Sequence, residues 1–175
     1  MRLIRQYESV IYGNYHKAAL QGGVVIGLAL LVYILLFFFV GNPISSPETF
    51  GIDGVLFLCT GSIFVLYRRR LPDGKVSMKE LMLLGVDACL IGAALYGVEL
   101  YLYATLLDVQ FSDRCFSTMA KGLQDADDTQ VVNIISNYSA VNWALMGCVR
   151  LAVMSIIFVL VLALCMRTEK SRLKQ

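Results

Sequence analysis

The sequence predicts an all-α integral membrane protein, a four-transmembrane-helix bundle with both termini on the cytoplasmic side. Three observations predict this fold. Hydrophobic residues make up 58% of the 175 positions and charged residues only 16%, whereas a soluble domain normally carries about 25% charged residues. The apolar residues gather into four long runs. Most lysines and arginines lie outside these runs, on one side of the predicted membrane.

Four spans are predicted, at residues 18–40, 52–67, 81–107 and 143–166. The first contains 23 residues without a charge, which at about 1.5 Å per residue is enough to cross a hydrocarbon core of about 30 Å. The longest polar stretch between spans is about 35 residues, shorter than an unaided hydrophobic core usually requires. We therefore expect residues 1–175 to form a single membrane domain.

The basic residues predict the orientation. Lysine and arginine in short loops resist translocation, whereas acidic residues contribute little. The opposite side of the membrane holds only Arg114 and Lys121 among basic residues. Twelve of the fifteen basic residues share the other side: Arg2, Arg5, Lys17, Arg68, Arg69, Arg70, Lys75, Lys79, Arg167, Lys170, Arg172 and Lys174. We expect these twelve to mark the cytoplasm, to which four spans return the chain.

Short amphipathic helices are predicted in the outer loop between the third and fourth spans. Apolar residues recur at helical spacing over residues 112–123, and we expect Phe116 and Met119 to face the bundle or the membrane interface. Cys115 should lie outside the cell. Thr129 has the character of an N-cap for a second short helix. These helices either cover the ends of the spans or provide a docking site for a partner.

The N-terminal segment shows an amphipathic pattern before the first span. Leu3, Ile4, Tyr7 and Ile11 share one helical face. Such a segment can lie in the membrane interface, and we expect it to be retained rather than cleaved.

Stripes of small residues predict where the helices pack. Gly23 and Gly27 form a GxxxG step in the first span, and small residues let helix backbones approach closely in lipid. We expect packing within the chain, with homodimerisation through Gly23 and Gly27 as the alternative. The third span carries a longer stripe that includes Gly85, Gly92 and Gly97.

Three ionisable residues lie within the apolar runs, namely Asp87, Glu99 and Arg150. A charge at mid-membrane costs at least about 2.5 kcal/mol on insertion scales, so each requires a partner or water. Glu99 and Arg150 each lie roughly 10–12 Å from the outer end of their spans, and we expect them to pair. Asp87 lies near the cytoplasmic end, where the sequence offers His16, Lys17 or Arg68 as partners.

No catalytic motif is present in the sequence. It contains a single histidine and lacks the nucleophile-elbow, zinc-protease and phosphate-loop patterns. We expect no catalytic residues, no metal site and no cofactor, since the acidic run of Asp125, Asp127 and Asp128 is more typical of a solvated loop than of a cation site. The formal charge of only +2 gives no support to nucleic-acid binding.

The hairpin after the second span and the start of the outer loop carry a resemblance to a known family. The hairpin reads Tyr67-Arg68 and then Asp73-Gly74-Lys75-Val76-Ser77, with Gly85 beyond it, and the outer loop opens at Asp108 and Phe111. With its four spans, the chain resembles domain of unknown function 4199 over nearly its whole length. Members are small inner-membrane proteins found mainly in Bacteroidetes, and they often carry Ile-Asp-Pro where this sequence has Leu107-Asp108-Val109.

The resemblance implies a four-span protein of a bacterial inner membrane, and it supplies no catalytic residues because the family has no established activity. Our leading hypothesis is a non-enzymatic accessory or scaffold subunit of the cell envelope. Its expected partners are the lipid bilayer and either another membrane protein or a second copy. The alternative is a small transporter or channel subunit in which Asp87, Glu99 and Arg150 line a polar path.

Overall fold

The computed structural model describes residues 2–40, 50–71, 76–114, 117 and 139–166. Its long helices are α1 (Arg2–Phe39), α2 (Phe50–Arg70), α3 (Met78–Leu102) and α6 (Ala140–Met166), and a π-helix, η1 (Tyr103–Leu107), continues α3. Four helical segments are long and apolar enough to cross a membrane: Tyr15–Phe39, Gly51–Arg70, Met78–Leu107 and Ala140–Met166. The four predicted spans are therefore confirmed as helices, and their ends differ from the prediction by at most three residues.

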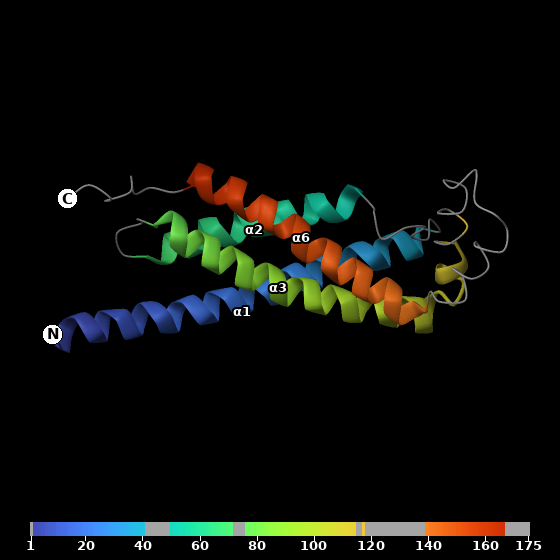
Figure 1. Ribbon diagram of the computed structural model, residues 1–175, viewed down its shortest axis with the longest axis horizontal. Coiled ribbons are helices and arrows are strands. Elements are labelled where there is room, and N and C mark those ends of the chain that lie inside the picture. The colour runs from blue at the N-terminus through green and yellow to red at the C-terminus, as the bar shows by residue number, and fades with distance from the viewer. Residues whose placement is uncertain (1, 41–49, 72–75, 115–116, 118–138, 167–175) are drawn as a thin grey trace.

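Helix α3 lies at the centre of the packing. Its most extensive interfaces are with α1 and α6, and α2 completes the bundle by contacting α1, α6 and, less extensively, α3. The N-terminus of α1, the C-terminus of α2, the N-terminus of α3 and the C-terminus of α6 all lie at one end of the bundle (Figure 1). We call this the basic end, because Lys17, Arg68, Arg69, Arg70 and Lys79 lie there. The opposite end is called the far end.

Local sequence explains where α2 and α3 begin and end. Helix α2 ends in three arginines, which favour the negative end of the helix dipole. Helix α3 begins with a capping box: the Ser77 side chain accepts a hydrogen bond from the Glu80 backbone N–H at 3.2 Å, and the Ser77 backbone N–H donates to the Glu80 carboxylate at 2.9 Å. Helix α3 therefore begins at a defined residue.

The N-terminal amphipathic segment is part of α1. The helix runs from Arg2 to Phe39 without a break, and its first turns extend past the basic end of the bundle (Figure 1). This segment continues the line of the span, whereas the sequence favoured a placement in the plane of the interface.

The five glycines predicted to mediate packing lie against neighbouring helices. A Cβ atom at Gly23 would lie 2.5 Å from the Ile91 Cβ of α3, and one at Gly92 would lie 2.5 Å from the Ile26 Cγ2 of α1. Gly27 meets Leu95 in the same interface. The GxxxG step therefore packs within the chain, and α3 occupies the surface that dimerisation through Gly23 and Gly27 would require.

The stripe on α3 continues toward the other two helices. Gly85 lies between Phe64 of α2 and Val159 of α6, and Gly97 lies against Cys148 of α6. At position 85 only glycine fits without a shift of its neighbours, because a Cβ there would lie 2.7–2.8 Å from the Phe64 ring and the Val159 methyl carbons. Helix α3 is thus held closely on more than one side.

The outer loop is described only in part. Residues 111–114 and 117 are helical, and Phe111 is fully buried against the rings of Tyr103 and Trp143. The predicted helix over residues 112–123, with Cys115, Phe116 and Met119, lies mostly outside the described residues, as does the helix predicted after Thr129.

The α1–α3 contact generates a stability prediction. Replacing Gly92 with leucine should force Ile26 and α1 away from α3, and overpacking of this kind typically costs about 1–3 kcal/mol. The matched control is Gly54→Leu, because a Cβ at Gly54 meets no atom within 4 Å. Thermal unfolding in detergent should show a lowered midpoint for the first variant alone. Equal midpoints for the two variants would contradict the close packing.

Candidate functional site

Arg150 forms an ion pair with Asp53. Its Nη2 atom donates to the Asp53 Oδ2 atom at 2.8 Å. Asp53 lies in the first turn of α2 and Arg150 lies in the first half of α6, so the pair joins α2 to α6 in the half of the bundle nearer the far end. The sequence analysis had counted Asp53 only among the outer acids. The sequence analysis predicted that Arg150 pairs with Glu99. This prediction is wrong, because the ion pair joins Arg150 to Asp53.

The faces of α3 explain why Glu99 does not meet Arg150. Gly92 and Leu95 contact α1, and Glu99 follows them by seven and four residues, which places it on the same helical face. Gly97, on another face of α3, contacts α6. Matching depths alone predicted the pair, but depth does not specify the direction in which a side chain leaves its helix.

Asp87 accepts a hydrogen bond from the hydroxyl of Tyr15 on α1. The sequence offered His16, Lys17 or Arg68 as partners. In the structure the partner is Tyr15, the residue before His16. A tyrosine can span this distance because its ring lies along apolar surface while its hydroxyl reaches a polar partner. The Asp87 carboxylate is thus held against α1 near the basic end.

Asp87 and Glu99 belong to one line of residues, which we call the α1–α3 seam: Asp87, Ile91, Leu95 and Glu99, at four-residue intervals. Ile91 fills the space over Gly23, and Leu95 fills the space over Gly27. The two acids are separated by twelve residues, or about 18 Å along the helix. Between the two acids, the side chains of Ile91 and Leu95 pack against α1 and leave no gap over Gly23 and Gly27.

The Glu99 Oε2 atom is buried and has no hydrogen-bond partner among the described residues. The Asp53 Oδ1 atom is in the same state, but the other oxygen of Asp53 pairs with Arg150. An unpaired carboxylate in a low-dielectric setting is costly unless it is protonated or hydrated. The sequence pattern did not indicate that Glu99 would have a buried carboxylate oxygen without a partner.

A second polar cluster lies at the far end. Asp108, 8% exposed, accepts a hydrogen bond from the Tyr103 hydroxyl at 3.0 Å and forms an ion pair with Arg114. The Asp108 backbone N–H donates to the Tyr103 carbonyl, which ends the π-helix. The sequence analysis missed these roles because the wider π-turn shifts the register that an α-helical pattern assumes. This cluster fixes the start of the outer loop.

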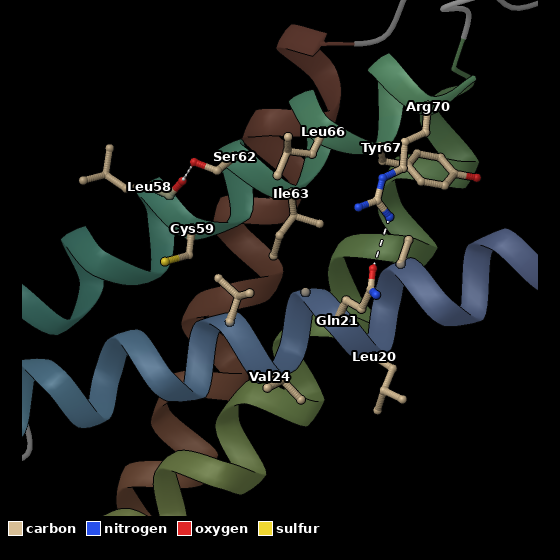
Figure 2. Close-up of a pocket in the computed structure, with 13 residues that line it drawn as sticks. Leu20, Gln21, Val24, Leu58, Cys59, Ser62, Ile63, Leu66, Tyr67 and Arg70 are labelled. Carbon is tan, nitrogen blue, oxygen red and sulfur yellow. Dashed lines mark hydrogen bonds between the residues drawn. The ribbon is translucent and has the colours of Figure 1, made fainter. Parts of the chain in front are cut away.

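A groove runs between α1 and α2 in the half of the bundle nearer the basic end. Its volume is about 710 Å³. Figure 2 shows Cys59 and Ile63 of α2 directed toward α1, and Arg70 reaching across to Gln21. The Arg70 Nη1 atom donates to the Gln21 Oε1 atom at 3.1 Å. The sequence analysis did not find this groove, because its walls consist of ordinary apolar span residues.

The described residues contain no group of three histidine, cysteine or acidic side chains that could hold a metal ion. Asp125, Asp127 and Asp128 lie outside the described residues. Four cysteines are described, and all are free: Cys59, Cys89, Cys148 and Cys165.

A double-mutant cycle tests the Asp53–Arg150 pair. Asp53→Leu or Arg150→Met alone should destabilise the protein by about 3–5 kcal/mol, because each leaves one charge without its partner, whereas the double variant should lie near wild type. Unfolding in detergent gives the three free energies. The matched cycle is Glu99→Gln with Arg150→Met, whose effects should add to within about 0.5 kcal/mol. Stronger coupling in the Glu99 cycle than in the Asp53 cycle would contradict the assignment.

Comparisons with known proteins identify the family. No curated protein and no solved structure matches the chain at a significant level. Residues 21–168 match the family described as Protein of unknown function (DUF4199). The matched residues include almost all of the four spans, together with the hairpin and the outer loop. The match confirms the resemblance that the hairpin and the start of the outer loop carried. The chain therefore belongs to this family of unknown function.

Proposed function

We propose that the chain is a non-enzymatic accessory or scaffold subunit of the cell envelope, a multi-pass protein of a bacterial inner membrane with both termini in the cytoplasm. One observation carries the proposal: three of the ionisable side chains within the spans, those of Asp53, Asp87 and Arg150, join one helix to another. Tyr15 ties α1 to α3 through Asp87, and Asp53 ties α2 to α6 through Arg150. A rigid bundle of this kind suits a protein that holds others in place.

The closed seam argues against a path for solutes. Between Asp87 and Glu99, the side chains of Ile91 and Leu95 lie close to the glycines of α1. Ala88, Cys89 and Ala93, toward the middle of α3, are at most 1% exposed. A transport route normally requires an interrupted helix or a polar cavity near mid-membrane.

The alternative, a small transporter or channel subunit, is favoured by Glu99. A buried carboxylate oxygen without a partner among the described residues is typical of a group that binds or relays a cation or proton. In the alternative, Asp87 and Arg150 would serve the same path. The seam would then have to open between Leu95 and Gly27.

A reconstitution experiment separates the two functions. The protein is placed in liposomes, and proton and potassium flux are recorded for wild type, Glu99→Gln and the exposed control Leu106→Ala. We expect all three to equal empty liposomes, because the seam is closed. Flux by wild type that Glu99→Gln abolishes and Leu106→Ala preserves would overturn the scaffold proposal and establish the alternative.

A subunit should also be recovered with its assembly. Native mass spectrometry of the chain released from membranes with surrounding lipid should show another membrane protein, or a second copy, in a fixed ratio. Recovery of the 19.4 kDa chain as a monomer alone, across detergent and detergent-free preparations, would contradict the proposal.

The proposed topology is tested by cysteine labelling in intact cells. In a Cys115→Ser background, Ser117→Cys should react with an impermeant maleimide, because the basic residues of the hairpin are expected to stay in the cytoplasm. Lys79→Cys, exposed at the basic end, should react only after the cells are permeabilised. The reverse pattern would invert the orientation.

A further inference from the structure

The groove between α1 and α2 has an apolar body and a polar mouth. Its walls include Val24 and Val25 of α1 and Leu58, Ile63 and Leu66 of α2. All of these except Ile63 expose 40–69% of their surface, so the groove opens sideways toward the surrounding lipid. At the basic end it adjoins a second hollow of about 240 Å³, which Gln21, Tyr67 and Arg70 also line.

The mouth of the groove is cationic. Lys17 lines the smaller hollow beside Arg70, and both side chains are exposed. The ion pairs Arg114–Asp108 and Arg150–Asp53 involve neither of these cations, and among the described residues no carboxylate lies within salt-bridge distance of Lys17 or Arg70. The Arg70 guanidinium is instead held by the neutral amide of Gln21 at 3.1 Å (Figure 2). It is therefore positioned across the mouth with its charge uncompensated by these residues.

The length of the groove identifies the kind of molecule that fits. Along α2 it extends from Leu58 to Arg70, twelve residues or about 18 Å. One leaflet of a bilayer contributes about half of a hydrocarbon core of about 30 Å. A transmembrane helix of a partner would need contact across the full thickness. The groove instead matches one acyl chain of one leaflet.

We propose that this groove binds one anionic phospholipid from the leaflet at the basic end. The phosphate of the headgroup lies between Lys17 and Arg70, and Gln21 keeps the Arg70 guanidinium over the mouth. One acyl chain lies between α1 and α2, along Val25 and Leu66 and over Ile63. Basic pockets between transmembrane helices bind anionic headgroups in this manner. The site is independent of whether the chain serves as a subunit.

The headgroup half of the site is tested by native mass spectrometry of the full chain in mild detergent, with phosphatidylglycerol and phosphatidylcholine of the same acyl chains as probes. Wild type should retain one phosphatidylglycerol in preference to phosphatidylcholine. Lys17→Gln and Arg70→Gln should each weaken its retention about fivefold, since a basic residue near the headgroup contributes about that factor. The matched control is Arg69→Gln, an exposed neighbour outside both hollows, which should retain the lipid.

The acyl-chain half is tested by filling the groove. Val25→Trp places a large ring in the groove, and Val32→Trp places the same ring seven residues further along the same face of α1, outside it. Only Val25→Trp should displace phosphatidylglycerol. Two outcomes would overturn the site: an equal loss of the lipid with Arg69→Gln, or retention of the lipid by Val25→Trp. If Val25→Trp retains the lipid but loses a bound protein, the groove is instead a contact for a partner's helix.

Discussion

The close approach of α1 and α6 to α3 is the constraint on which the other features depend. Apolar side chains gain little by leaving lipid for the interior of a bundle, so transmembrane helices associate through van der Waals contact at small residues. Gly23 and Gly92 meet large side chains across the α1–α3 interface, and Gly97 meets α6 on another face. These contacts fix the rotation of α3 about its own axis, and that rotation determines which helix each of its polar side chains meets.

The polar contacts and the groove follow from this arrangement. With Gly92 turned toward α1, Asp87 and Glu99 also face α1, so Arg150 pairs with Asp53 across the α2–α6 interface. Because α1 packs mainly on α3, it shares a smaller interface with α2, and a groove remains between them. Arg70, the last of the three arginines that end α2, then places a positive charge at the mouth of that groove.

Much of the fold could be predicted from the sequence, because the length of an apolar run and its lack of charged residues are enough to identify a transmembrane helix. The glycine stripe likewise indicated which surface of α3 packs. The pairing of side chains could not be predicted in the same way. Depth suggested that Glu99 meets Arg150, but the partner depends on helix rotation, which single-sequence patterns do not supply. The role of Asp108 was not predicted because the π-helix from Tyr103 to Leu107 changes the helical spacing. The groove was not predicted because it is the space left between α1 and α2, which depends on how the two helices pack.

The placement of α3 against α6 can be measured directly, since Gly97 lies opposite a native cysteine. A Cβ at position 97 would lie 3.1 Å from the Cβ and 3.8 Å from the Sγ of Cys148, close to the separation of about 3.5–4.5 Å between the Cβ atoms of a disulfide. The measurement is mass spectrometry of peptides from Gly97→Cys protein, oxidised in native membranes. The account predicts an intramolecular bridge between positions 97 and 148. A chain in which both thiols stay free, or in which position 97 bridges only to a second molecule, would contradict the arrangement of helices on which the account rests.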